Sequence, residues 1–237
     1  MRADELAANL AAVRRRIEVA CESAGRDPGE VSLVVVTKFF PASDVRLLAD
    51  LGVTDVGENR HQEAEAKAAE CADLGLRWHF IGGLQSNKAA AVASYADVVE
   101  SLDRAKLVGP LSRGAQARTD ATGVAAGVDV LLQVSLDPPG TGHRSGAAPA
   151  ELDPLAQRVE ESETLRLRGL MAVAPLGEDP AAAFARLAAI REDFVREHPR
   201  ATVLSAGMSG DLEAAVAHGA THVRVGSAVL GPRPAVQ

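Results

Sequence analysis

Lys38 stands at the end of a short, strongly apolar segment. The run Val31-Ser32-Leu33-Val34-Val35-Val36 is rich in β-branched residues, as is typical of a strand buried on both faces, and Thr37-Lys38 follow it directly. An ammonium group at the rim of a low-dielectric core loses solvation, so its pKa falls and a fraction becomes an unprotonated amine that can attack an aldehyde. The alternative is a lysine that closes the strand and extends its charged end into water.

Two segments near the carboxyl end have the composition of anion-binding turns. Residues 205–211 read Ser-Ala-Gly-Met-Ser-Gly-Asp and lead from a predicted strand into a predicted helix, and Arg224-Val225-Gly226-Ser227 ends the last predicted strand. Glycine allows close approach to the backbone, and the N–H groups at the start of a helix can bind an anion. Turns of this composition also cap many helices without binding any ligand.

The elements that must position these residues alternate along the chain. Eight short apolar runs predict strands, at Ser32–Thr37, Asp55–Gly57, Trp78–Ile81, Val98–Ser101, Val128–Val134, Arg168–Val173, Thr202–Ser205 and His222–Val225. Alanine-rich or amphipathic segments between them predict helices, at Ala42–Asp50, His61–Ala72, Lys88–Tyr95, Arg104–Arg118, Pro149–Glu161, Pro180–Glu197 and Asp211–His218. The pattern predicts an α/β fold, a single TIM-type (β/α)8 barrel with an extra N-terminal helix over Arg2–Ala24. An open doubly wound sheet is the alternative, but it usually carries a glycine-rich turn after its first strand, where Phe39-Phe40-Pro41 stands here.

Composition restricts the functional classes. The chain has 237 residues, 47% hydrophobic and 24% charged, which is enough to bury one large core. A net charge of −7 argues against a general nucleic-acid or membrane-surface binder. No apolar stretch approaches membrane-spanning length, so we expect a cytoplasmic protein. Cys21 and Cys71 are far apart in helical patterns and are predicted to be packing residues, and we expect neither a disulfide framework nor a metal site.

In a barrel the carboxyl ends of all strands converge on one face, where active sites form. This face would carry Lys38, Asn59 after the second strand, Met171 in the sixth, Ser205 after the seventh and Arg224 in the eighth. The long loop over residues 137–146 is predicted to be a mobile part of the same face. Because the loops after the seventh and eighth strands often hold a phosphate, an amine and a phosphate anchor would share the face. That combination indicates pyridoxal 5'-phosphate (PLP).

The sequence resembles the pyridoxal phosphate homeostasis proteins, which are related to the N-terminal barrel domain of alanine racemase. The resemblance covers nearly the whole chain. It rests on a set of short motifs: Val36-Thr37-Lys38, Gly57-Glu58-Asn59, Trp78-His79-Phe80-Ile81-Gly82, Leu84-Gln85-Ser86-Asn87-Lys88, Gly169-Leu170-Met171, Leu204-Ser205, Gly207-Met208-Ser209-Gly210-Asp211 and Val223-Arg224-Val225-Gly226.

The resemblance implies one PLP-binding domain over residues 1–237 that holds the cofactor as a Schiff base on Lys38. Such a protein takes part in intracellular PLP homeostasis, acts as a monomer and has no established catalytic turnover; the apo-forms of PLP-dependent enzymes are its candidate partners. By the same match the cofactor-binding residues would be Lys38, Asn59, Met171, Ser205, Met208, Arg224, Gly226 and Ser227.

A PLP-dependent racemase, or a related small amino-acid-transforming enzyme, is the alternative function. Arg224 keeps its proton, so if it faces the pyridine nitrogen it leaves that nitrogen unprotonated and the ring a weaker electron sink. Racemization also needs a second acid/base on the other face of the substrate, and the sole tyrosine, Tyr95, lies in a helical pattern after the third strand. Both observations favour a carrier over a racemase.

His79 is interpreted as a packed strand histidine, with a cofactor role as the alternative.

Overall fold

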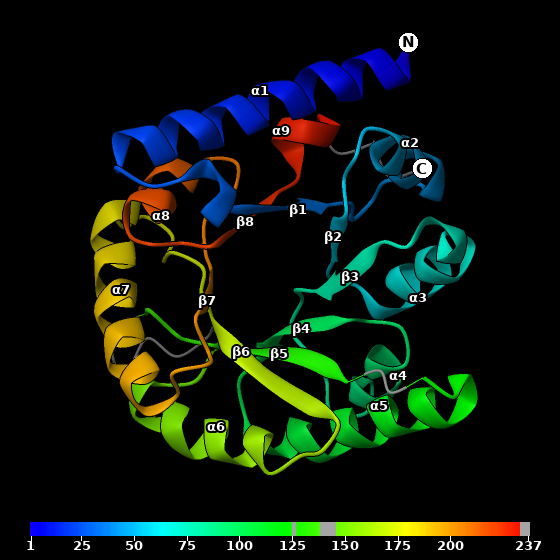
Figure 1. Cartoon of the computed structure of the whole chain (residues 1–237), viewed down its shortest axis with the longest axis vertical. Helices are drawn as coiled ribbons and strands as arrows, with labels where there is room; N and C mark the ends of the chain where they lie inside the picture. Colours follow the sequence, from blue (N-terminus) through cyan, green and yellow to red (C-terminus); the bar gives the residue numbers. More distant parts are fainter. Residues whose placement is uncertain (125–126, 138–145, 233–237) are drawn as a thin grey trace.

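Eight parallel strands form a closed barrel in chain order, as the sequence predicted (Figure 1). The computed structural model describes residues 1–124, 127–137 and 146–232, so most of the loop predicted over residues 137–146 lies outside the described residues. The strands are β1 (Ser32–Val36), β2 (Asp55–Glu58), β3 (Arg77–Phe80), β4 (Val98–Leu102), β5 (Val128–Gln133), β6 (Leu165–Met171), β7 (Val203–Ser205) and β8 (His222–Val225). All eight predicted strands are therefore present.

Strand β6 begins three residues before the predicted Arg168. In its first part, leucines that face the core alternate with the exposed Arg166 and Arg168. The prediction followed continuous apolar runs, and an alternating start does not give that signal because the strand emerges into solvent at the amino-terminal end of the barrel.

Helices cover the outside of the barrel. Their bounds are α1 (Arg2–Ser23), α2 (Ala42–Asp50), α3 (His61–Glu70), α4 (Ala89–Ala93), α5 (Val108–Thr122), α6 (Leu152–Glu160), α7 (Pro180–Glu197), α8 (Leu212–Ala217) and α9 (Ser227–Leu230). The helix predicted over Arg104–Arg118 is instead a 3-10 turn, η3 (Ala105–Leu107), followed by α5, because Pro110 has no N–H to continue a helix from Arg104. Helix α9 was not predicted, since four residues are too few to show a periodicity. In the described part of the chain, none of the helices is both long and apolar enough to span a membrane.

Helix α1 packs against α8 and α9, the helices that follow β7 and β8. Figure 1 shows it along one side of the barrel beside α8 and α9, and it buries Leu6, Leu10, Val13 and Ile17 as one helical stripe. The Arg2 guanidinium donates to Asp44 in α2 at 2.7 Å and to the Leu230 carbonyl in α9 at 3.0 Å. The extra helix thus supports the loops that form one wall of the candidate site.

Two apolar clusters fill the space between barrel and helices. One lies under α4 to α7 and the other under α1, α2, α8 and α9. Cys21 and Cys71 are unpaired and buried in the second cluster, where they pack as small apolar residues.

Candidate functional site

A pocket of about 250 Å³ opens at the carboxyl ends of β1, β7 and β8. Five of the eight predicted site residues line it: Lys38, Met208, Arg224, Gly226 and Ser227. The remaining lining residues are Val36, Phe39, Phe40, Ile81, Ser209, Gly210 and Gly231. Sequence reasoning placed Ser209 and Gly210 in the predicted turn but did not single them out, because composition does not show which residue of a turn faces inward.

Asn59, Met171 and Ser205 do not line this pocket. Ser205 is buried directly behind Arg224, whose Nη1 donates to the Ser205 Oγ at 2.7 Å. Met171 is buried inside the barrel wall, opposite Ser205 in the β6–β7 pairing. Asn59 is half-buried after β2, and its Oδ1 has no hydrogen-bond partner among the described residues. The prediction grouped all residues at the strand ends, but successive strand residues point to opposite sides and only some reach the mouth of the pocket.

The backbone around Lys38 is held in a tight turn. The Phe40 N–H donates to the Thr37 carbonyl at 3.1 Å, and Phe39 has a φ of 71°, the only left-handed non-glycine residue in the described chain. Such a conformation costs roughly 1–2 kcal/mol for a residue with a Cβ, so neighbouring contacts must maintain it. The Phe39 N–H donates to the Glu63 Oε1 at 2.6 Å. The Lys38 Nζ lies 6.0 Å from the centroid of the Phe39 ring.

A cluster of the buried Thr37, Glu58 and Lys67 with the half-buried Glu63, called here the Lys67 cluster, fixes this turn. The Lys67 Nζ donates to the Thr37 carbonyl at 2.8 Å and to the Oε1 atoms of Glu58 and Glu63, each at 2.7 Å. The Thr37 Oγ1 also donates to the Glu58 Oε1 at 2.7 Å. Burial raises the pKa of Glu58, while Lys67 and Thr37 act in the opposite direction. Both residues that flank Lys38 are therefore anchored, Thr37 directly by Lys67 and Phe39 through Glu63.

The two small-residue turns adjoin at the other wall of the pocket. A Cβ on Gly226 would lie 3.2 Å from the Val36 carbonyl oxygen, so the turn after β8 packs against the last residue of β1. The Ser227 Oγ donates to the Ser209 Oγ at 3.3 Å, which joins the turn after β8 to the turn after β7. Gly207 has a φ of 91°, and a Cβ there would approach the Ala215 Cβ to 2.6 Å. Glycine is thus required for the close packing of the turn after β7 on α8.

Arg224 is buried, and its guanidinium is held on two sides. Besides its bond to Ser205, its Nη2 donates to the Ala172 carbonyl at 2.9 Å. Full burial lowers the pKa of Arg224, and the nearby Glu100 carboxylate opposes that effect. The guanidinium remains a fixed cation that reaches the pocket from the barrel interior.

These residues fit a small aldehyde that carries a phosphate. The pocket offers one amine, from Lys38, and a wall of glycine and serine backbone that leaves room for a phosphate group. Arg224 also lines the pocket, and its guanidinium could donate to the acceptor nitrogen of an aromatic ring. Together these groups could hold PLP.

The chain matches a protein-family model over most of its length. The family model described as "Alanine racemase, N-terminal domain" matches residues 8–234. Among curated proteins, a pyridoxal phosphate homeostasis protein of Mycobacterium tuberculosis is 45% identical over 245 residues, covering 98% of this chain and 94% of its own. Proteins of the same name from Pseudomonas aeruginosa and Escherichia coli K12 are 43% and 39% identical; the chain coverage is 96% and 97%, and that of the relatives 96% and 97%.

Solved structures with the same fold include PipY of Synechococcus elongatus PCC7942 with PLP bound. Its TM-score is 0.79 at 36% identity, covering 95% of this chain and 100% of PipY. A protein described as unknown from Bifidobacterium adolescentis gives a TM-score of 0.84 at 34% identity, with 96% and 95% coverage. Alanine racemase of Corynebacterium glutamicum is 18% identical with a TM-score of 0.63, covering 99% of this chain and 62% of the racemase, which shows likeness of fold alone.

The Lys67 cluster generates a prediction about stability. Lys67→Met removes the only cation in hydrogen-bond contact with Glu58 among the described residues and leaves a buried carboxylate unpaired. The free energy of unfolding, measured by urea denaturation, should fall by about 3–5 kcal/mol. The matched variant Lys106→Met replaces an exposed lysine and should change it by less than about 0.5 kcal/mol. If both variants changed the free energy of unfolding by similarly small amounts, the Lys67 cluster would not be what holds the Lys38 turn.

Proposed function

This chain belongs to the family of the alanine racemase N-terminal domain and, within it, to the pyridoxal phosphate homeostasis proteins. From that premise we propose that it is a non-catalytic PLP-binding protein that holds the cofactor as a Schiff base on Lys38 and takes part in intracellular PLP homeostasis. The observation that carries the proposal is the meeting of Lys38, Arg224 and the Gly226-Ser227 turn in one pocket.

Lys38 supplies the covalent bond. Its Nζ would hold the cofactor, since a lysine amine can condense with an aldehyde to a Schiff base with loss of water. The anchored neighbours Thr37 and Phe39 keep the amine at the mouth of the barrel, so little ordering of the chain is needed for the reaction. The backbone and hydroxyl groups of Ser209 and Ser227 would receive the phosphate.

The donor set of the pocket supports a role without turnover. PLP, when bound, supplies an electron sink for carbanions at the amino-acid α-carbon. Arg224 would donate a hydrogen bond to the pyridine nitrogen and leave it unprotonated, which weakens that sink. Among the described lining residues, Lys38 and Arg224 are the only ionisable groups. A racemase needs a second acid/base on the opposite face of the substrate, and no such group stands in this part of the pocket.

Tyr95 does not supply that group either. It stacks on His61 with ring centroids 5.9 Å apart, and its hydroxyl lies 3.5 Å from the His61 Nδ1. Burial raises the pKa of the Tyr95 hydroxyl far above its usual range. A phenol that stays protonated and does not line the pocket is unsuited to proton transfer there, which favours the carrier over the racemase.

We propose that residues 1–237 act as one domain, as a cytoplasmic monomer, and that the protein exchanges PLP with the apo-forms of PLP-dependent enzymes. The net charge of −7 supports small-molecule and protein partners over nucleic acid or membrane.

Lys38→Ala tests the covalent bond. The variant mixed with PLP should lose the yellow Schiff-base band that the unmodified protein shows, because no amine remains at the pocket. Absorbance spectra of the purified proteins measure this. Lys106→Ala, at an exposed lysine in η3, should keep the full band. A band of normal intensity in Lys38→Ala would assign the bond to another lysine.

Ser227→Glu tests the phosphate anchor. A carboxylate in the wall of the pocket repels a phosphate dianion, so the dissociation constant for PLP should rise at least about tenfold. Unphosphorylated pyridoxal lacks that charge, and its affinity should change little. Fluorescence titration with both ligands makes the comparison. Equal losses for the two would mean that Ser227 supports the pocket in general and not the phosphate.

Exchange of the α-proton of alanine tests the absence of turnover. In deuterated solvent the PLP-loaded protein should exchange the α-proton of L- or D-alanine no faster than free PLP, because the pocket has a weakened sink and no opposing acid/base. Proton NMR follows the α-proton signal. Rapid interconversion of the enantiomers would overturn the carrier proposal in favour of the racemase alternative.

A further inference from the structure

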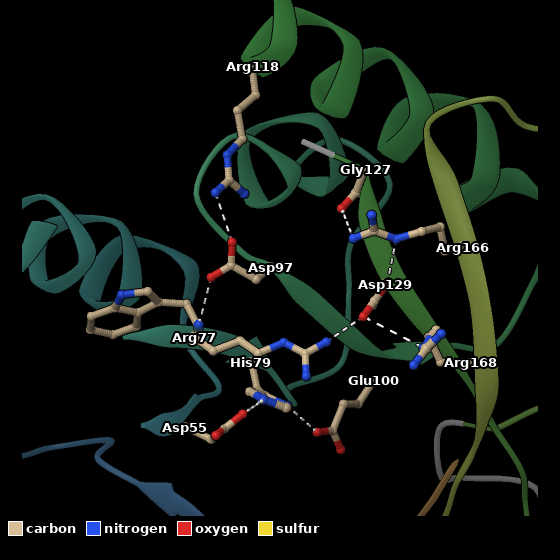
Figure 2. Close-up of polar contacts among 11 residues, drawn as sticks. Asp55, Arg77, His79, Asp97, Glu100, Arg118, Gly127, Asp129, Arg166 and Arg168 are labelled. Carbon is tan, nitrogen blue, oxygen red and sulfur yellow. Dashed lines mark hydrogen bonds and ion pairs between the residues drawn. The ribbon is translucent and has the colours of Figure 1, made fainter. Parts of the chain in front are cut away.

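A chain of polar groups, all buried except the half-buried Asp55, crosses the barrel interior from Arg224 toward the amino-terminal end. It consists of Arg224, Ser205, Glu100, His79 and Asp55, one from each of five strands, and is called here the His79–Glu100 chain. The Arg224 Nη1 donates to the Ser205 Oγ at 2.7 Å, and that hydroxyl donates to the Glu100 Oε2 at 2.6 Å. The Glu100 Oε1 lies 2.7 Å from the His79 Nδ1, and the Asp55 Oδ1 lies 2.9 Å from the His79 Nε2 (Figure 2).

The geometry assigns the charge of His79. Both ring nitrogens lie within hydrogen-bond distance of a carboxylate oxygen, and a carboxylate can only accept, so both nitrogens must donate. A histidine with two N–H groups is the imidazolium cation. Burial alone would lower the pKa of His79, but the bonds to Asp55 and Glu100 raise it above its ordinary value.

Glu100 is a carboxylate shared by two cations. It is fully buried, hydrogen-bonded to His79 and 3.8 Å from the Arg224 Nη1. Burial would raise the pKa of Glu100, but His79, Arg224 and Ser205 lower it to about 2. Along the His79–Glu100 chain the charges therefore alternate: Asp55 is negative, His79 positive, Glu100 negative and Arg224 positive.

Other charged groups near His79 are already engaged. The half-buried Arg77 donates to Asp129, which also accepts from Arg166 at 2.7 Å (Figure 2). The ring of His222 lies 6.4 Å from that of His79, and burial lowers the pKa of His222, which favours its neutral form. Asp55 and Glu100 are thus the groups in direct contact with His79 in the described chain, and Glu100 is its link to the pocket.

We propose that Glu100 and His79 are positioning residues that set, through Arg224, the electrostatic potential at the ring-nitrogen side of the cofactor pocket. This inference rests on the proposed function. The Arg224 cation lines the pocket, and the Glu100 carboxylate reduces the positive potential that Arg224 produces there. The His79 cation in turn reduces this effect of Glu100. The two residues therefore act on the pocket with opposite signs.

Opposite signs give a test that a purely structural role does not reproduce. Glu100→Gln keeps the shape of the side chain but removes the negative charge, so the pocket becomes more positive and the Schiff base on Lys38 should lose its proton at lower pH. His79→Gln removes the positive charge, so the same proton should be lost at higher pH. The midpoint pH for loss of this proton, read from the visible spectrum as a function of pH, should move by about half a pH unit or more in each variant.

Two further variants serve as controls. The double variant Glu100→Gln, His79→Gln removes one charge of each sign, and its midpoint should return toward that of the unmodified protein. His222→Gln replaces a neutral ring beside His79 and should leave the midpoint unchanged. Circular dichroism shows whether each variant is folded. Midpoints that move in the same direction in both single variants, or do not move, would overturn the inference.

The unmodified protein provides a measurement that does not depend on folding of the variants. Nitrogen-15 NMR of the histidine rings at neutral pH should show His79 with both nitrogens protonated and His222 neutral. A neutral His79 ring would overturn the inference even if the variants behaved as expected. The absence of a visible band in the unmodified protein would instead contradict the proposed function. A band that is present but insensitive to both substitutions would contradict the inference alone.

Discussion

The hydrogen bonds between β1 and β8 close the barrel and decide where the pocket lies. Ser32 to Val35 pair in register with His222 to Val225, so the segments that leave these two strands must run side by side. Lys38 is in one segment and Gly226 in the other, and the close packing of Gly226 on the Val36 carbonyl is a direct result. Lys38 and the Gly226 turn lie far apart in the sequence but become neighbours because the sheet is closed. An open sheet would leave them on separate edges.

Buried charge supports the pocket on both sides. The Lys67 cluster lies behind the turn that carries Lys38, and the His79–Glu100 chain lies behind Arg224. In each, cations and carboxylates contact one another inside the protein, where an unpaired charge would be strongly destabilising. The two arrangements fix the backbone on either side of Lys38 and the guanidinium of Arg224.

Much of the barrel followed from the sequence because the strands are apolar and the connections short. The lysine and the two turns were predicted from the same signals, as strand ends and small-residue loops. Ser205 and Met171 were assigned to the cofactor site although their side chains are buried behind it, since a run of residues at a strand end does not show which of them turns outward. Lys67 gave no signal, because a glutamate and a lysine four residues apart in a helix usually form an exposed pair. Its burial depends on β1, β2 and α3 meeting, which only the folded structure reveals.

A crystal structure of the protein grown with PLP tests the central claim most directly. We expect continuous electron density from the Lys38 Nζ to the cofactor, with the phosphate against Ser209 and Ser227 and the pyridine nitrogen facing Arg224. Density that joins the cofactor to another lysine, or a cofactor with its phosphate away from these two turns, would contradict it.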